Sequence, residues 1–276
     1  MSDMFGFDAF SPSQIAQRVD QVGVIKARLP LLPLIMLGLL AGAFIGLGGM
    51  CFVLVKSDLS LGFAMGQLLG GMAFCLGLLL VVVAGAELFT GNNLLVMAWA
   101  DGLITSKELL RNWLVVCLAN FAGAAGLAVI VYLSGHPEMN DGAVAATYLN
   151  IAVAKSELSF SAAFFKGIMC NVLVCLAVWM AFAGRSVTDK AVAIVFPITA
   201  FVAAGFEHSV ANMYFFPMAM LLEQDTGITG MEELISWSSF FGNLVPVILG
   251  NIIGGGVLVA LVYHLIYGRN MMTKKP

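Results

Sequence analysis

The histidine at position 208 is the residue in this sequence best placed to do chemistry. His208 lies between Glu207 and Ser209 inside an otherwise apolar segment, whereas His136 falls in a polar stretch and His264 lies near the end of the last apolar segment. An ionisable side chain within a membrane segment is costly and marks a functional site, such as a path for an ion or a proton. A lone buried histidine can also be a satisfied core residue. We favour function for His208 because a helical pattern is interrupted there.

The composition places these residues in a membrane. Of the 276 residues, 61% are hydrophobic and 11% are charged, against roughly 45–50% and about 25% in an ordinary soluble domain. Apolar runs of about twenty residues are long enough to span a bilayer as helices. They exclude a soluble enzyme and also an outer-membrane barrel, whose strands alternate over about ten residues. The net charge of -3 gives no sign of a nucleic-acid partner, and we expect an all-α protein embedded in a lipid bilayer.

Six apolar segments are predicted to cross the membrane, and the second and fifth are interrupted: 31–55, 64–99, 109–134, 160–183, 191–222 and 239–267. Ten Lys and Arg residues fall on the side of the two termini, and three fall on the opposite side, namely Lys56, Lys155 and Lys166. By the positive-inside rule both termini are therefore cytoplasmic. The expected location is a bacterial-type cytoplasmic (inner) membrane.

Short segments flank the expected membrane domain, 31–268. Residues 1–30 are predicted to form a cytoplasmic N-terminal arm with a short amphipathic helix. This helix begins at Ser11-Pro12, which reads as an N-cap followed by proline at the first helical position, and we expect it to lie on the cytoplasmic membrane surface. Residues 269–276 are the expected cytoplasmic tail.

The two interrupted segments carry the same motif. Residues 84–92 and 204–212 both read A-G-x-E-x-x-x-x-N. A second repeat pairs asparagines of the third and sixth segments at one offset: Asn112 with Asn243, and Asn120 with Asn251. Two matching pairs in the same order indicate two three-helix halves, at about 31–134 and 160–268.

Three spans per half is an odd number, so the halves must cross the membrane in opposite senses as an inverted repeat. This symmetry is typical of transporters and channels, and it places two broken helices near the bilayer midplane. The N-termini of the half-helices would present free N–H groups and positive dipole ends to an anionic substrate. The breaks are therefore the leading candidate site.

The charged and amide residues shared by the two copies of the motif are predicted to be structural. Glu87 and Glu207 are expected to accept hydrogen bonds from loose N–H groups at the breaks, with Asn92 and Asn212 as the other structural residues there. An ionised carboxylate lining an anion path would repel the substrate, which favours this interpretation.

Three further polar residues are candidates for the site. Thr90 lies in the break of the second segment, and Asn171 lies in the fourth segment, where it either contacts His208 or bridges two helices. Lys155 falls in the expected loop on the side opposite the termini, where a solvated charge is the simplest interpretation. The five cysteines all lie in apolar runs with no metal-ligand spacing, so we expect neither a metal nor a cofactor.

The chain resembles the formate/nitrite transporter family over nearly its whole length. Four stretches carry the resemblance: Gly85–Asn92 (GAELFTGN), Cys170–Met180 (CNVLVCLAVWM), Gly205–Met213 (GFEHSVANM) and Gly250–Gly256 (GNIIGGG). The family consists of pentameric channels with an aquaporin-like protomer. The resemblance therefore implies a homopentamer and a channel, not an enzyme.

The resemblance also implies roles for individual residues. It makes His208 the central pore histidine, with Asn171 beside it, and it places Lys155 at the outer vestibule. Thr90 matches the threonine of the loop that breaks the second span, near Leu88 and Phe89. The implied apolar constrictions have Phe74 and Leu78 on one side, and Phe201 and Val174 on the other.

The expected function is passive or proton-linked transport of a small monovalent anion, with formate as the favoured substrate. Nitrite is the alternative because the stretch Ala154–Glu157 lacks the extra histidines of many formate channels, and lactate, acetate and hydrosulfide are further candidates. A remote alternative is an intramembrane hydrolase that uses His208 and Ser209. Neighbouring residues on a helix point about 100° apart, which makes that pair a poor catalytic dyad.

Overall fold

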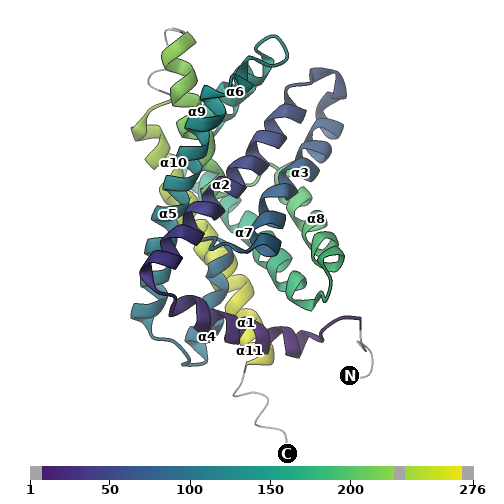
Figure 1. The fold of residues 1–276 in the computed structure, drawn as a ribbon, viewed down its shortest axis with the longest axis vertical. Helices are drawn as coiled ribbons and strands as arrows, with labels where there is room; N and C mark the ends of the chain where they lie inside the picture. Colours follow the sequence, from purple (N-terminus) through teal and green to yellow (C-terminus); the bar gives the residue numbers. More distant parts are fainter. Residues whose placement is uncertain (1–7, 227–233, 269–276) are drawn as a thin grey trace, which may run out of the picture.

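The structure, a computed structural model, describes residues 8–226 and 234–268. Within these two ranges it is helical and contains no strand, as predicted. The expected tail 269–276 and the first seven residues of the expected arm lie outside the described residues. Long helices run between the two ends of the bundle, with α1, α4 and α11 at one end and α6 at the other (Figure 1).

The two halves have a similar order of helices. A 3-10 turn at His136–Glu138 lies between the halves, and another at Leu59–Leu61 lies between the second and third helices of the first half. The first half consists of α1 (Pro12–Ala27), α2 (Leu31–Lys56), α3 (Gly62–Leu80), a π-helical turn (Val81–Gly85), a 3-10 turn (Gly91–Leu95), α4 (Val96–Ala100) and α5 (Ser106–Leu133). The second half consists of α6 (Ala143–Ser156), α7 (Phe160–Ala183), α8 (Val187–Ala203), α9 (Ser209–Thr226), α10 (Trp237–Ile252), a π-helical stretch (Ile253–Leu261) and α11 (Val262–Tyr267).

Five helical stretches in the described part of the chain are long and apolar enough to cross a membrane. The remaining crossing is made by α8 and α9 together, with the predicted break between them. The predicted interruption of the second segment is also present, between α3 and α4. The six predicted spans and the two broken spans therefore match the structure.

A glycine opens each break. Gly85 has a φ of +88° and Gly205 a φ of +68°, in the left-handed region that a residue without a Cβ adopts at little cost. A Cβ added at either position would meet nothing within 4 Å. The backbone conformation, and not lack of space, is therefore what requires glycine at both breaks.

The prediction for the surroundings of α1 was wrong in one respect. Ser11 caps the helix in a capping box with Gln14, and Pro12 is its first residue, as expected. However, Ile15 and Val19 are buried in a cluster with residues of α4 and α7. The apolar face of α1 therefore packs against the end of the bundle. It is covered by protein side chains and not by lipid.

The prediction that Lys155 lies in a polar loop was also wrong. It lies in the last turn of α6, a helix of 14 residues, and its side chain is only 14% exposed. The apolar residues Val144 and Tyr148 of this helix are fully buried. Helix α6 packs against α9, so Lys155 is held inside the fold.

Candidate functional site

Two cavities enter the bundle from its two ends. The first, here called the α1 cavity, has a volume of about 450 Å³ and takes part of its wall from Val19 to Lys26 of α1. The second, the α6 cavity, has a volume of about 280 Å³ and takes part of its wall from Ile151 to Lys155 of α6. Because α1 and α6 lie at opposite ends (Figure 1), the cavities approach each other from opposite sides.

A buried apolar barrier separates the two cavities. Phe74 and Leu78 lie one turn apart on α3, yet Phe74 lines the α6 cavity and Leu78 lines the α1 cavity. The ring of Phe74 meets Phe201 edge-on, with 5.7 Å between centroids. Phe201 in turn stacks on the imidazole of His208 at 5.9 Å. On the other side of the barrier, Leu88 lines the α1 cavity.

His208 and Thr90 meet at this barrier and join the two halves. Thr90 Oγ1 lies 2.9 Å from His208 Nε2, and both side chains are buried. The N–H of Ala211 donates to His208 Nδ1 at 3.1 Å, so Nδ1 acts as an acceptor. A neutral imidazole then carries its proton on Nε2 and donates it to the hydroxyl of Thr90.

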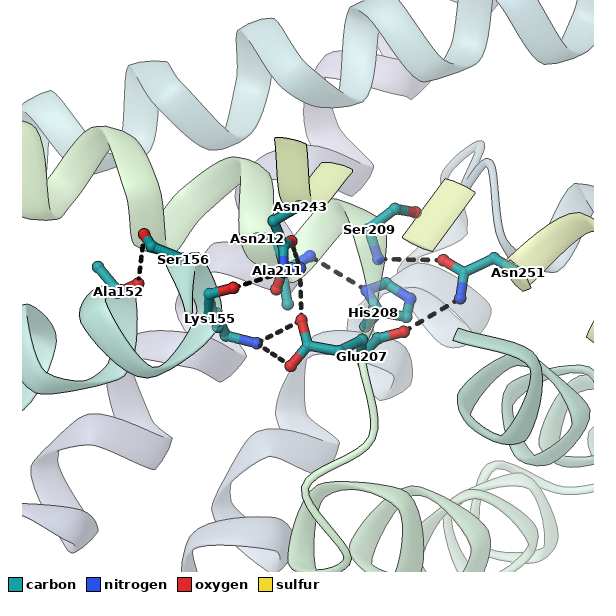
Figure 2. A network of polar contacts seen from close by, with 10 residues as sticks. All are labelled: Ala152, Lys155, Ser156, Glu207, His208, Ser209, Ala211, Asn212, Asn243 and Asn251. Atoms are coloured by element: carbon teal, nitrogen blue, oxygen red, sulfur yellow. Dashed lines mark hydrogen bonds and ion pairs between the residues drawn. The ribbon is translucent and has the colours of Figure 1, made fainter. Parts of the chain in front are cut away.

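An ion pair and two asparagine amides hold the break beside His208 (Figure 2). Lys155 Nζ donates to both carboxylate oxygens of Glu207, at 2.8 and 2.9 Å. Asn212 Nδ2 donates to Glu207 Oε2 and to Asn243 Oδ1, both at 2.7 Å. Asn243 Nδ2 closes the network by donating to the carbonyl of Lys155 at 3.0 Å. Glu207 is thereby fixed by a charge and an amide at once.

The first half repeats this network with one difference: Lys26 Nζ donates to Asn92 Oδ1 at 2.9 Å as well as pairing with Glu87, whereas Lys155 donates to both oxygens of Glu207. Lys26 Nζ pairs with Glu87 at 2.9 Å, and Asn92 Nδ2 donates to Glu87 Oε2 and to Asn112 Oδ1 at 2.7 and 3.0 Å. Asn112 Nδ2 donates to the carbonyl of Lys26 at 3.1 Å. Helix α1 therefore belongs to the repeat as the counterpart of α6.

Asn251 and Asn120 tie each break to its neighbouring helices. Asn251 Oδ1 accepts from the N–H of Ser209 at 3.0 Å, and its Nδ2 donates to the carbonyls of Gly167 and Glu207 at 2.8 and 3.1 Å. Asn120 makes the same three contacts in the first half, with the N–H of Phe89 and the carbonyls of Gly38 and Glu87.

These networks correct two expectations about the breaks. The N–H groups of Ser209, Ala211 and Phe89 were expected to be free for an anion, but each is taken by a side chain of the protein. The carboxylates of Glu87 and Glu207 were expected to accept from backbone N–H groups, but their partners are the lysine and the asparagine side chains. These three N–H groups are thus satisfied within the protein, in keeping with the high cost of a bare N–H in a membrane.

Asn171 forms no hydrogen bond with His208, so the interpretation that it bridges helices is the one the structure favours. Its Nδ2 donates to the carbonyls of Thr90 and Asn251, at 3.2 and 2.7 Å. It therefore fixes the backbone of Thr90, whose hydroxyl faces the imidazole. Cys175 Sγ also donates to the carbonyl of Thr90 at 3.4 Å.

The remaining candidates divide between lining and support. Lys155, Phe74, Phe201 and His208 line the α6 cavity, and Leu78 and Leu88 line the α1 cavity. Phe89 and Val174 line neither cavity. Phe89 packs edge-on against Trp113 at 6.4 Å, and Val174 is buried in the core. Both side chains therefore lie outside the two cavities, in the protein that surrounds the barrier.

Lys26 is the residue that the sequence reasoning missed. Its separation from Gly38 equals the separation of Lys155 from Gly167, and both glycines accept from the paired asparagines. Extending the repeat by this spacing would have found the lysine. In the sequence, Lys26 falls in the expected N-terminal arm, outside the expected membrane domain 31–268.

These features define a class of protein: a helical membrane protein with an inverted repeat and two broken spans, as transporters and channels have. The sequence model described as formate/nitrite transporter matches residues 13–265. This chain belongs to that family, as the motifs at the two breaks predicted.

Known proteins resemble the chain over nearly its full length. The formate channel FocA of Escherichia coli (strain K12) is 39% identical over 274 residues, which cover 95% of this chain and 96% of that protein. A solved structure of a pentameric formate channel with formate bound is also 39% identical, with a TM-score of 0.80 over 86% of this chain and 97% of that one. An FNT family ion channel is 29% identical, with a TM-score of 0.81 over 92% and 98%. These matches confirm the predicted fold.

Proposed function

We propose that this protein is a channel that passes formate across the cytoplasmic membrane, by a path within each protomer. The observation that carries the proposal is the pair of cavities that approach the His208 barrier from opposite ends of the bundle. The 39% identity to the formate channel of Escherichia coli supports formate as the substrate. The similarity to a structure with formate bound supports it as well.

The hydrogen bond between His208 and Thr90 gives the barrier its polar contact. A formate oxygen that arrives from the α6 cavity accepts the Nε2 proton in place of the hydroxyl of Thr90. An anion that leaves water for an apolar passage loses a large solvation free energy, and this hydrogen bond offsets part of the loss. Formate that takes up a proton in the cavity crosses as the neutral acid, which removes most of the remaining cost.

Phe74, Phe201 and Leu78 set the size of the passage. All three side chains are almost fully buried, and the two rings fix each other edge-on. A one-carbon carboxylate needs less displacement of these groups than a longer monocarboxylate does. Asn171, Phe89 and Val174 act from behind by holding Thr90 and the wall in place.

The proposed oligomer is inferred from the apolar exterior of the protomer, and its orientation in the membrane from the distribution of Lys and Arg. Leu110, Leu114 and Leu118 form an exposed apolar face on α5, as lipid or a second protomer requires, and the solved formate channel is pentameric. We propose a homopentamer with one path in each protomer. The positive-inside rule places the α1 end in the cytoplasm and the α6 end outside.

The protein is not an enzyme in this proposal. An intramembrane hydrolase would need Ser209 to pass its proton to His208. Yet Nδ1 of His208 accepts from Ala211, and Nε2 faces Thr90. No nitrogen of the imidazole is left to act as a base for Ser209.

Uptake by purified protein in liposomes tests the proposal. Formate and nitrite are offered in turn at two external pH values, while internal pH and current are recorded. Formate uptake that rises at acid pH, acidifies the lumen and carries little net charge is the expected result. Protein-free liposomes and the variant His208→Phe serve as controls.

Nitrite is the competing outcome of the same experiment. Current carried equally by both anions, without a linked proton, would make the protein a general small-anion channel. His208 would then act only as a hydrogen-bond donor to the anion, without any linked proton transfer. Absence of formate uptake by folded protein would refute the proposed function.

A further inference from the structure

The α6 cavity carries two positive charges that nothing in the described residues neutralises. The charged residues in its wall are Lys56, Lys155, Lys166 and Glu207. The charge of Lys155 is offset by that of Glu207, because Nζ of Lys155 donates to both oxygens of the carboxylate. Neither Lys56 nor Lys166 forms an ion pair within residues 8–226 and 234–268. Three lysines and one glutamate leave the cavity with a net charge of +2.

The repeat shows that Lys166 is not there for the fold. Its carbonyl accepts from the N–H of Glu207 at 3.3 Å, and in the other half the carbonyl of Leu37 accepts from the N–H of Glu87 at 3.2 Å. Both residues also line the cavity of their own half. The same scaffold position thus holds a leucine on one side and a lysine on the other. A charge that the backbone does not need, on a membrane helix where charge is costly, indicates a function.

The walls of the α6 cavity make these charges effective. Aromatic side chains form much of its lining: Phe52, Phe74, Phe201, Phe206 and Phe215. A cleft with walls of low dielectric and charges of one sign focuses the field and raises the local concentration of counter-ions. The field of Lys56 and Lys166 is therefore directed along the cavity toward its closed end at His208.

The α1 cavity differs. Its lining lysines are Lys26 and Lys190, and Lys26 is paired with Glu87. Lys190 thus gives that cavity a net charge of +1, against +2 for the α6 cavity. Without Lys166 the two cavities would have the same net charge.

We propose that Lys166, assisted by Lys56, is the charge that concentrates the permeating anion in the α6 cavity. Lys155, which the family resemblance places at the outer vestibule, holds Glu207 and contributes little to this attraction. Lys166 is a positioning residue, since it acts on the anion before the anion reaches His208. This inference rests on the proposed function, because it concerns capture of the same anion.

The test measures initial uptake of formate by the full-length protein in right-side-out vesicles, over a range of formate concentrations. The variants are Lys166→Leu, which installs the residue of the other half, Lys166→Arg, and the double variant Lys166→Leu with Lys56→Gln. The matched control is Lys107→Gln, which removes an exposed lysine at the opposite end. Each is measured at ionic strengths of about 0.01 M and about 1 M, where the Debye length is about 30 Å and about 3 Å, adjusted with an impermeant salt.

At low salt the double variant should take up dilute formate about tenfold more slowly than the wild type, with Lys166→Leu in between. The rate at saturating formate should stay unchanged, because the barrier is untouched. High salt should remove the difference, Lys166→Arg should restore uptake, and Lys107→Gln should behave as the wild type.

Two results would overturn the inference. One is a Lys166→Leu protein whose uptake of dilute formate equals that of the wild type at low salt. The other is a wild-type rate that does not fall as salt rises, and this second measurement needs no variant to fold. If the wild type takes up no formate at all, the proposed function fails instead, so the two failures are distinguishable.

Discussion

The ion pair between Lys155 and Glu207 predicts an unequal response to removing its two members. The side chain of Glu207 is 5% exposed, so in Lys155→Gln it would be left as an almost fully buried charge without its cation. Loss of one partner from a buried pair costs about 3–5 kcal/mol of unfolding free energy. We therefore expect Lys155→Gln to be strongly destabilised.

The opposite variant, Glu207→Gln, should cost much less. Lys155 lines the α6 cavity, so its ammonium can be hydrated there once the carboxylate is gone. The glutamine oxygen still accepts from Asn212, and the loss is that of hydrogen bonds to a charged group, about 1.5–3 kcal/mol. The double variant Lys155→Gln with Glu207→Gln contains no stranded charge and should regain much of the stability that Lys155→Gln loses.

The assay is unfolding by SDS in mixed micelles, with the yield of folded oligomer after heating as a second readout. The exposed Lys107→Gln serves as the control for loss of one positive charge. Lys26→Gln should repeat the effect at reduced size, because the side chain of Lys26 is 25% exposed. A Lys155→Gln protein as stable as the wild type, or a double variant less stable than both single variants, would refute the reasoning that the pair is structural.

Three further predictions concern the barrier. His208→Phe should abolish or severely slow formate flux in liposomes, because it removes the ionisable group between the cavities; unchanged flux in folded protein would contradict a central role. Thr90→Val keeps the side-chain volume but removes the partner of Nε2, so we expect formate flux to fall about tenfold, the effect of about 1.4 kcal/mol, while oligomer yield stays normal; a flux equal to that of the wild type would show that the hydroxyl is dispensable. Phe74→Ala or Phe201→Ala should open the edge-on pair and weaken discrimination against lactate and acetate, and an unchanged ratio of uptake rates would place the size filter elsewhere.

The sequence predicted the elements of this fold well, because membrane spans and their interruptions leave strong local signals. The repeated A-G-x-E-x-x-x-x-N motif located both breaks, and the paired asparagines located the helices that hold them. The contacts of those residues were predicted less well. Glu207 was expected to bind backbone N–H groups, but the structure gives it Lys155 and Asn212. Lys155 lies 52 positions from Glu207 on another helix, and local patterns carry no information about which distant side chain reaches the carboxylate.

The candidate site was predictable only in part for the same reason. The position of His208 in a break was visible in the sequence, whereas its contact with Thr90 joins the two halves across 118 positions. For Asn171 the sequence allows either a contact with His208 or a bridge between helices, because the rotation of its helix decides which residues it faces. The helix that carries Lys155 was missed since α6 is too short to be read as a span.

Comparison of the two halves separates scaffold from function. The lysine, glutamate and asparagine positions agree in both halves, and in each half the lysine forms an ion pair with the glutamate of the break. These positions therefore serve the breaks, which both halves must stabilise.

Among the positions that differ, three border the path or its barrier. His208 stands where the first half has Leu88, Thr90 where the second half has Val210, and Lys166 where the first half has Leu37. A repeat of the first half at both breaks would supply leucine and threonine without a histidine, and a repeat of the second half would supply histidine and valine without a hydroxyl. Neither arrangement could form the contact between Nε2 and a hydroxyl. The contact needs a histidine from one half and a threonine from the other, so the symmetric scaffold brings the groups together and the asymmetric residues determine what the junction can bind.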